Sequence, residues 1–384
     1  MYPDLSYILH ALFGTEPDNA FSIVKTFGLL LGCAVFCSGW MLYYELIRKE
    51  AAGQLQGRME SVIVYKPVSW TDILTQTLIN FIIGYKFGLA FHDFTAFQAD
   101  PAAAVFSTKG YMPAGLLLGF LTFGYWYFKK EKQTDLETRR QTVLVRPVDR
   151  IYDITALAAI SGIVGSKLFS VLENFGDFLQ DPIGSFFSGS GLTIYGGLIL
   201  AFIVVSRYIR SKGLNLLHMM DAIAPTLMIG YAVGRMGCHL SGDGDWGIVN
   251  EMTKPGWFFL PDSWWAYGYP HNVINEGQLI EGCTWRHCHE LMPKVFPTPL
   301  YEAILAGLIT LVLWFLRTRI HYAGVLFFLY CLLNGIERFF IETIRVNPRY
   351  DFLGFHPSLS QFIAVLLILT GIGGMINFQR KKIQ

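Results

Sequence analysis

Long runs of apolar residues constrain this chain more than any other feature. Of its 384 residues, 53% are hydrophobic and only 15% are charged, and the mean hydropathy is +0.40. A helix of about 20 apolar residues crosses the hydrocarbon core of a bilayer. This pattern predicts an all-α polytopic membrane protein with about nine transmembrane helices. The stretches are approximately Ile23–Ile47, Leu74–Phe91, Gly110–Phe128, Ile154–Leu172, Leu192–Tyr208, Ala222–Leu240, Leu300–Leu316, Ala323–Ile341 and Leu359–Phe378.

The basic residues of the short loops predict which way the helices cross the membrane. Lys and Arg cluster in cytoplasmic loops of membrane proteins. Here they follow the odd-numbered stretches, as at Arg48 and Lys49, Lys129 and Lys130, Arg207 and Arg210, Arg317 and Arg319, and Arg380 to Lys382. This alternation predicts an N-terminus outside and a C-terminus in the cytoplasm. Residues 241–299 are then an extracytoplasmic cap between the sixth and seventh helices.

Two close cysteines lie within the predicted cap, in the run Cys283-Thr-Trp-Arg-His-Cys288. Cysteines on the outer side of a membrane are expected to form disulfides. A local disulfide is therefore favoured. A zinc site is the alternative, because His287 and His289 lie beside the two cysteines. The cap is also rich in Trp and Tyr, which favour the membrane–water interface.

An arginine at the end of the sixth apolar stretch is the first candidate functional residue. Arg235 opens a run of glycines and acidic residues, Gly234-Arg-Met-Gly-Cys-His-Leu-Ser-Gly-Asp-Gly-Asp-Trp-Gly247. An ionisable group at this depth is costly and needs a partner or a function. A cation beside glycine backbone suits a phosphate. Arg235 is therefore predicted to hold an anionic phosphate headgroup near the outer face. In the alternative, the glycines cap the helix and Arg235 reaches the interface.

Other polar residues fall near the same predicted outer ends. Lys167 is either a second phosphate cation or a lysine that reaches the interface. Tyr195 is either an interfacial aromatic residue or a proton donor. Glu302 needs a cation, for which Arg235 and Arg338 are the candidates. Arg338 lies four residues before Glu342, on one helix face, so it either forms an internal ion pair or joins Arg235 on the anion.

Four blocks of sequence resemble the bacterial prolipoprotein diacylglyceryl transferase family. The run from Gly234 to Gly247 is similar to that family's Gly-Arg-x-Gly-Asn-Phe-x-Asn-Gly-Glu-x-x-Gly signature. Gly162-Ile-Val-Gly-Ser-Lys167 resembles its Gly-Gly-Arg block, and Pro297-Thr-Pro-Leu-Tyr-Glu302 its Pro-Ser-Gln-Leu-Tyr-Glu. Asn334-Gly-Ile-Glu-Arg338 through Arg345, followed by Ser360-Gln361, resembles its C-terminal block. The blocks occur in the family's order.

The resemblance implies a reaction and its substrates. Such a transferase moves the diacylglyceryl group of phosphatidylglycerol to the lipobox cysteine thiol of a preprolipoprotein, forming a thioether and releasing glycerol phosphate. The implied partners are phosphatidylglycerol, preprolipoprotein signal peptides and membrane lipid. The implied location is the bacterial inner membrane, with the active site toward the outer leaflet. No metal or cofactor is needed, and the net charge of +1 without a basic stripe predicts no nucleic-acid partner.

The predicted site combines the family blocks with the residue chemistry. The catalytic candidates are Arg235, Arg338, Asp243, His239, Tyr195 and Glu302. The lipid-binding candidates are Arg235, Arg338, Lys167, Gly196, Gly197, Ser241 and Gly247. Asp243 replaces the family's glutamate.

The chain also departs from the family. The histidine of its His-Gly-Gly is Tyr195 here, so the base that takes the thiol proton is predicted to be Asp243 or Asp245, with His239 second. Residues 51–150 resemble an insertion with two extra helices. It lies between an N-terminal segment, 1–50, and a transferase core, 151–384.

Two other kinds of function fit parts of this pattern. A non-catalytic relative that binds anionic lipid would explain the lost histidine but not the retained arginines. A small-anion transporter would need matching halves, which the sequence lacks. The transferase is the preferred interpretation.

Overall fold

The structure is a computed structural model. It describes residues 1–65, 67–99, 105, 107–132, 139–180, 193–347, 351 and 356–380. The chain forms two compact units. The first contains residues 1–55 and 214–384, and the second contains residues 56–213. Leu192, Lys381 and Lys382, which the sequence analysis used, lie outside the described residues.

Each predicted apolar stretch overlaps one long helix in the described part of the chain. In the first unit these helices are α2 (Thr26–Ala51), α12 (Leu216–Ser241), α14 (Thr298–Leu316), α15 (Val325–Ile341) and α16 (Leu359–Arg380). In the second unit they are α3 (Trp70–Phe87), α7 (Met112–Glu131), α8 (Ile151–Glu173) and α11 (Ile194–Ser211). The helical fold class is therefore confirmed.

Six helices in the described residues have the length and apolarity to cross a membrane. They are Thr26–Ala51, Trp70–His92, Pro147–Glu173, Leu216–Ser241, Thr298–Leu316 and Leu359–Phe378. Helix α15 has only 17 residues and is not among these six, because a helix of at least 18 residues is required. The chain is thus a multi-pass membrane protein. Nine crossings, and the side on which each loop lies, stay predictions.

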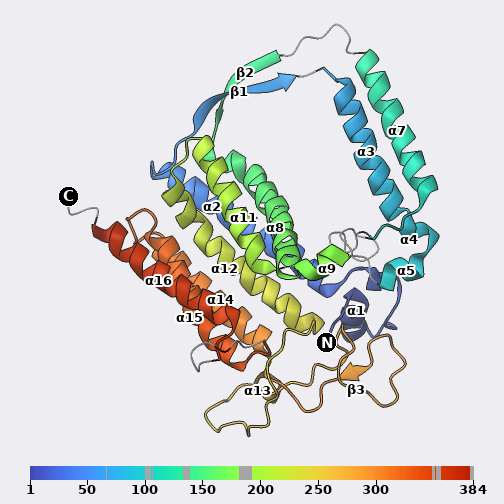
Figure 1. Cartoon of the computed structure of the whole chain (residues 1–384), viewed down its shortest axis with the longest axis vertical. Coiled ribbons are helices and arrows are strands. Elements are labelled where there is room, and N and C mark those ends of the chain that lie inside the picture. The colour runs from blue at the N-terminus through green and yellow to red at the C-terminus, as the bar shows by residue number, and fades with distance from the viewer. Residues whose placement is uncertain are drawn as a thin grey trace. The chain divides into compact units, whose positions relative to one another are not determined.

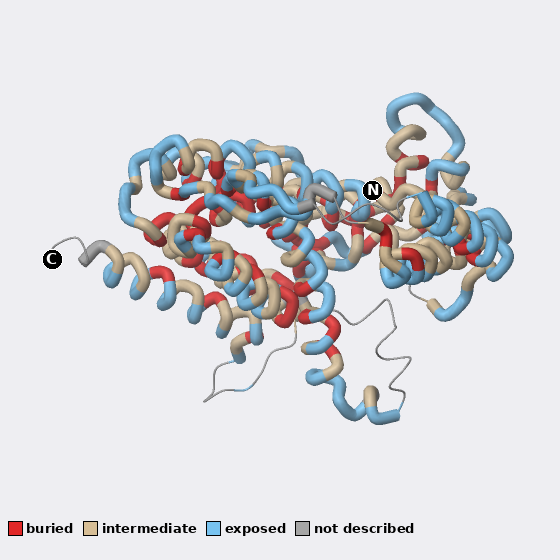
Figure 2. The backbone as a smooth tube through the Cα atoms, turned by 90° about the horizontal axis from the view of Figure 1, so that it is seen from above, coloured by how far each residue is buried: buried red, intermediate tan, exposed pale blue. Residues whose placement is uncertain are grey.

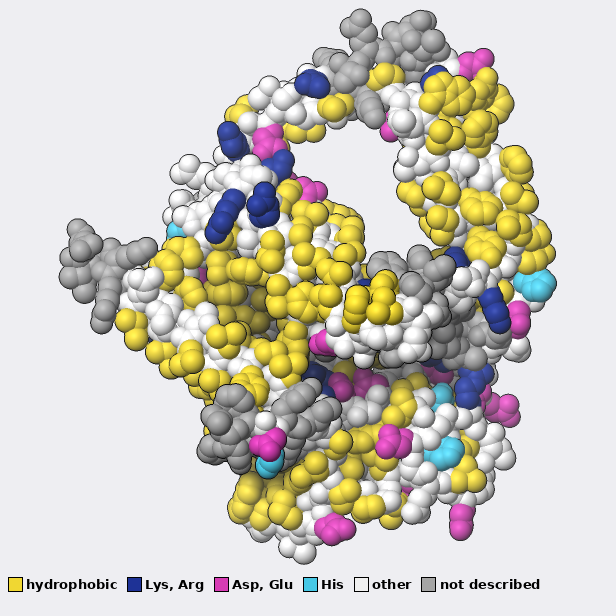
Figure 3. Space-filling model, in the orientation of Figure 1, with side chains coloured by type: hydrophobic (Ala, Val, Ile, Leu, Met, Phe, Trp, Pro, Cys, Tyr) yellow, Lys and Arg dark blue, Asp and Glu magenta, His cyan; other side chains and the backbone are white. Residues whose placement is uncertain are grey.

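Helix α12 is the centre of the first unit. It packs against α2, α14 and α15, and α15 packs against α16. In its most apolar 18-residue segment, 44% of the residues are buried, whereas 17% are buried in the corresponding segments of α2 and of α16. Buried residues gather inside the bundle in Figure 2, and apolar side chains cover much of the outer helix surfaces in Figure 3. Exposed apolar side chains on helices this long are expected where lipid replaces water.

The segment between α12 and α14 is a small cap with its own apolar core. Trp246, Tyr269, Leu291 and Val295 form that core. The cap contains α13 (Asp262–Trp265) and two short strands, β3 (Gln278–Leu279) and β4 (His289–Glu290), which pair antiparallel.

The predicted disulfide between Cys283 and Cys288 is confirmed. It leaves neither thiolate for the zinc alternative. The cap also contacts α1 (Leu5–Phe13), because the backbone amide of His287 donates a 3.2 Å hydrogen bond to Tyr7 Oη. The chain's N-terminal helix is thereby fixed to the cap.

The second unit contains a two-stranded sheet that was not predicted from sequence, in which β2 (Arg139–Val145) pairs antiparallel with β1 (Arg58–Tyr65). Arg150 after β2 is buried and pairs with Glu60 of β1. The two strands lie far apart in the sequence, so neither shows its partner locally. The short helices of this unit are α4 (Leu89–His92), α5 (Phe94–Ala99) and α9 (Phe175–Gln180), and three-residue or four-residue 3₁₀ turns in the chain are Ala20–Ile23, Pro147–Arg150 and Glu342–Ile344.

Helices α8 and α11 approach closely through glycines. A Cβ atom added at Gly165 would lie 2.5 Å from the carbonyl oxygen of Gly196, and one at Gly196 would lie 2.3 Å from the Cβ of Phe169. One at Gly197 would lie 2.3 Å from Ser166 Oγ. Such close packing is expected for membrane helices that meet through small residues.

These contacts predict the effect of adding one methyl group to α8. Gly165→Ala should destabilise the protein by about 1–3 kcal/mol, because the new methyl group meets backbone of α11. Gly162→Ala is the matched control, since nothing lies within 4 Å of its added Cβ. Thermal unfolding in detergent measures both. Equal effects of the two substitutions would show that the helix contact is not as close as described.

Candidate anion-binding site

Arg235 lies near the C-terminal end of α12, on the helix that the rest of its unit surrounds. Its side chain is only 10% exposed. Its Nε lies 2.9 Å from Glu302 Oε2, and its Nη1 pairs with Asp245. Its guanidinium also lies over the ring of Tyr231, 5.5 Å from the ring centre. The expected partner for a buried arginine is therefore present, in two carboxylates and one aromatic face.

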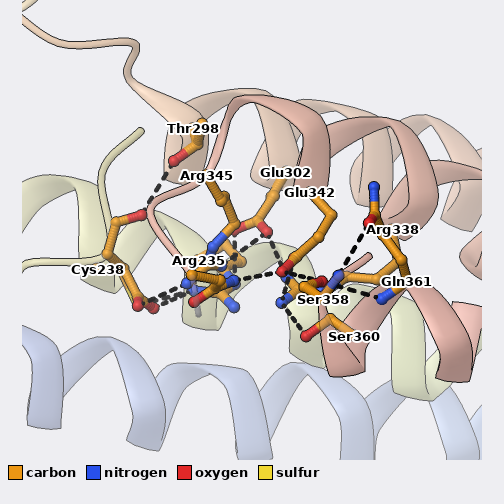
Figure 4. A network of polar contacts seen from close by, with 12 residues as sticks. Arg235, Cys238, Thr298, Glu302, Arg338, Glu342, Arg345, Ser358, Ser360 and Gln361 are labelled. Carbon is orange, nitrogen blue, oxygen red and sulfur yellow. Dashed lines mark hydrogen bonds and ion pairs between the residues drawn. The ribbon is translucent and has the colours of Figure 1, made fainter. Parts of the chain in front are cut away.

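Glu302 is the shared partner of three arginines. It lies in the first turns of α14, and its side chain is fully buried, with 0% exposed. Its Oε1 accepts hydrogen bonds from Arg338 Nη1 at 2.9 Å and from Arg345 Nη1 at 3.1 Å, while Arg235 lies on Oε2. Figure 4 shows the three arginines converging on this carboxylate. The sequence analysis named Arg235 and Arg338 as the alternative partners of Glu302, and both pair with it.

Arg338 is also held from its other side. Its Nη2 lies 3.0 Å from Glu342 Oε2, so the ion pair that was one of the two alternatives for their four-residue spacing is present. The same nitrogen donates a 3.2 Å hydrogen bond to Ser360 Oγ. Ser358 Oγ in turn donates a 2.7 Å hydrogen bond to Glu342 Oε1. The start of α16 thus fixes the arginine of α15.

Arg345 is positioned by backbone pairing with the loop that follows α12. Gly247 and Arg345 form an antiparallel bridge, and the amide of Ile248 donates a 2.9 Å hydrogen bond to the carbonyl of Ile344. A Cβ atom at Gly247 would lie 2.5 Å from that same carbonyl oxygen. Gly247 therefore lets two chain segments meet, and so brings Arg345 Nη2 to 2.8 Å from Asp245 Oδ1.

The charges of this cluster balance. Three guanidinium groups, Arg235, Arg338 and Arg345, face three paired carboxylates, Asp245, Glu302 and Glu342. We call these six residues the arginine cluster. Buried charges are tolerated only when they are paired and hydrogen-bonded. Removing a partner of one of the buried arginines or glutamates would therefore leave a buried charge less well compensated.

Asp243 and Asp245 lie in the same short loop but in different electrostatic settings. Burial alone would raise the pKa of Asp245, but the nearby Arg235 and Arg345 outweigh it and lower that pKa. Burial dominates at Asp243 and raises its pKa. The thiol of Cys238 donates a hydrogen bond to Asp243. Asp243 is therefore the carboxyl group of this loop with the greater affinity for a proton.

The other predicted site residues of this unit lie beside the cluster. His239 Nδ1 lies 3.2 Å from Tyr269 Oη, a residue of the cap core. Ser241 is 1% exposed, and its hydroxyl donates a 3.3 Å hydrogen bond to the carbonyl of Cys238. These contacts give both residues a structural partner, and their catalytic or lipid-binding roles stay predictions.

The remaining predicted residues belong to the second unit. Lys167 is buried on α8, and Tyr195, Gly196 and Gly197 lie in the first turn of α11. Gly196 and Gly197 have the packing role described above.

Three residues of the cluster, Glu342, Asp245 and Arg345, were not assigned to the anion site from sequence. Glu342 was noted only as a possible ion-pair partner of Arg338. Arg345 was noted only as part of a family block, and Asp245 only as an alternative base. In the sequence, a functional role for Arg345 and Asp245 was indicated by a charged side chain within a block that resembles the family. Their meeting depends on the bridge between Gly247 and Arg345, which joins positions about a hundred residues apart.

Cys238, Asp243 and Asp245 form a group whose possible ligand atoms all lie within 4.8 Å of one another. This group does not suit a divalent cation. Arg235 Nη1 lies 3.8 Å from Cys238 Sγ and also pairs with Asp245, so a positive charge already occupies the position.

A bundle of apolar helices that buries three arginines at one end is the arrangement expected of a membrane protein that handles an anionic group. The family model described as prolipoprotein diacylglyceryl transferase matches residues 114–377. This chain therefore belongs to the prolipoprotein diacylglyceryl transferase family and is a membrane transferase.

Similar curated proteins carry the corresponding name. Two of them, from Streptococcus pyogenes serotype M5 (strain Manfredo) and serotype M49 (strain NZ131), are named phosphatidylglycerol–prolipoprotein diacylglyceryl transferase. Each is 29% identical to this chain over 238 residues, which cover 61% of this chain and 81% of the relative.

The shared position of Glu302 predicts a large effect of neutralising it. Glu302→Gln should destabilise the protein by about 3–5 kcal/mol, because it removes the carboxylate that three buried arginines share and leaves three positive charges facing two negative ones. Glu251→Gln, on an exposed residue of the cap, should change stability by less than about 0.5 kcal/mol. Unfolding in detergent compares them. A stable Glu302→Gln protein would contradict the pairing.

Proposed function

We propose that this chain transfers the diacylglyceryl group of phosphatidylglycerol to a cysteine thiol of a preprolipoprotein. The observation that carries the proposal is the buried arginine cluster in a chain of this family. Phosphatidylglycerol supplies a phosphate, which is a strong ligand for guanidinium groups. The lipobox segment of the signal peptide and the lipid both reach such a site from within the membrane.

The reaction breaks the bond between the glycerol carbon of the diacylglyceryl group and the phosphate oxygen. The thiol sulfur forms the new bond to that carbon, and glycerol phosphate leaves with the bond's electron pair. Negative charge therefore grows on the phosphate in the transition state. Arg235, with Arg338 and Arg345 beside it on Glu302, is positioned to stabilise that charge without moving.

The substrate thiol must lose its proton, since the thiolate is the nucleophile. Asp243 is the proposed acceptor, because burial raises the pKa of its carboxyl group whereas nearby arginines lower that of Asp245. The carboxylate gains the proton while the leaving phosphate gains the charge. His239 is the alternative acceptor.

The proposed location is the bacterial inner membrane, with the arginine cluster and the cap on the outer side. The basic loops after the odd-numbered stretches support this orientation. In the second unit, Lys167, Gly196 and Gly197 are proposed as lipid-binding residues and Tyr195 as a catalytic residue. Residues 51–150 are proposed as an insertion that precedes the transferase core, 151–384. No cofactor takes part in the proposed reaction.

Complementation tests the proposed function. A bacterium depleted of its own diacylglyceryl transferase should regain the diacylglyceryl adduct on its lipoproteins when it expresses this chain. Arg235→Ala should abolish the adduct, because it removes the guanidinium proposed to hold the phosphate. Lipoprotein mass spectrometry is the readout, and membrane insertion of each chain is the control. An inserted parent chain that yields no adduct across several lipoprotein substrates would contradict the proposal.

The pH dependence of transfer identifies the base. If the Asp243 carboxylate accepts the proton, activity rises as pH rises through its raised pKa, which lies above the ordinary value of about 4. Asp243→Asn should lower the rate by about 10²–10⁴-fold and remove that rise. His239→Ala should preserve it. The reverse pattern would assign the base to His239.

A further inference from the structure

The charge balance of the arginine cluster raises a question about binding, and this inference rests on the proposed function. A phosphodiester brings one negative charge to a cluster whose three arginines are already paired with three carboxylates. A fourth anion beside them would be opposed by repulsion unless one carboxylate moved away. One of the three carboxylates must therefore move away from the arginines when the phosphate binds.

The three carboxylates differ in burial. The side chains of Glu302 and Glu342 are 0% exposed, whereas that of Asp245 is 39% exposed. Both glutamates project from the helical segments that form the bundle, while Asp245 lies on the loop between α12 and the cap. Asp245 is thus the carboxylate that a phosphate can replace beside the arginines with the least loss of packing.

Asp245 also binds the arginines as a phosphate would. Its Oδ2 pairs with Arg235 and its Oδ1 lies 2.8 Å from Arg345 Nη2, so two oxygens of one anion bridge two guanidinium groups. In addition, the buried Nε of Arg345 has no hydrogen-bond acceptor within the described residues. A phosphate offers more oxygens than a carboxylate, so it can satisfy the same two groups and this further donor.

The surrounding contacts allow the side chain to leave while the backbone stays. The carbonyl of Asp245 accepts a 3.0 Å hydrogen bond from Thr298 Oγ1, and its amide lies 3.3 Å from Asp243 Oδ1. Arg235 and Arg345 each keep Glu302 as a partner when Asp245 departs. Exchange therefore requires rotation of one short side chain and leaves both arginines in place.

We propose that Asp245 lies where the phosphate of an anionic lipid binds, and that this phosphate displaces its carboxylate from the two arginines. The displaced carboxylate competes with the bound anion for the same two arginines. It therefore weakens the binding of phosphate-bearing ligands, including the glycerol phosphate product, whose release it promotes by returning. Asp245 is in this view a positioning residue that sets the affinity of the site.

Binding of phosphate to the purified full-length chain tests this exchange. Asp245→Asn should bind inorganic phosphate, and phosphatidylglycerol in nanodiscs, about tenfold more tightly than the parent, because the competing charge is gone. Glycerol phosphate should then become a stronger inhibitor of transfer. Asp262→Asn is the matched control, since that exposed cap residue pairs with Lys254 and should leave phosphate affinity unchanged. Unchanged or weaker phosphate binding in Asp245→Asn would overturn the proposal.

A second variant keeps the test decisive if Asp245→Asn is not recovered folded. Arg345→Gln removes one of the two bridged arginines and leaves Asp245 its pair with Arg235. Its phosphate affinity should fall about tenfold, and an unchanged affinity would overturn the exchange. Phosphatidylcholine nanodiscs distinguish the anionic lipid from a phosphate group alone. The binding assay needs no prolipoprotein, so tighter phosphate binding in Asp245→Asn without any transfer by the parent would refute the proposed function and support the exchange.

Discussion

The structure of the site depends on the fully buried carboxylate of Glu302. Three arginines, from α12, from α15 and from the segment after it, lie within 3.1 Å of its two oxygens. No helix of the bundle could bury its arginine alone, because an unpaired guanidinium in an apolar interior is strongly unfavourable. The shared carboxylate therefore couples helix packing to the position of the three positive groups.

The elements around Glu302 each have a part in that arrangement. Helix α12 is the most buried of the helices that can cross a membrane, and it brings Arg235 to the edge of the cap. Two residues at the ends of the cap contact the cluster. Gly247 forms a backbone bridge with Arg345, and Thr298 donates a hydrogen bond to the carbonyl of Asp245. Three guanidinium groups held in place at the end of an apolar bundle result, as a preorganised site for a phosphate requires.

Much of this could be predicted from sequence where the signal is local. The apolar runs predicted the long helices, the spacing of Arg338 and Glu342 indicated an ion pair as one of two alternatives, and the close cysteines predicted the disulfide. The pairing of β1 with β2 and the place of Arg345 beside Asp245 could not be predicted, because each joins distant segments. The choice between Asp243 and Asp245 likewise depends on which carboxylate faces the arginines, and sequence alone does not show that.

An experimental structure of the chain in phosphatidylglycerol nanodiscs tests most directly whether the arginine cluster binds the lipid phosphate. The phosphate should lie within about 3.2 Å of guanidinium nitrogens of Arg235, with Glu302 still buried among the three arginines. A lipid phosphate bound elsewhere, with the cluster's ion pairs intact, would contradict the assignment of these arginines to the phosphate.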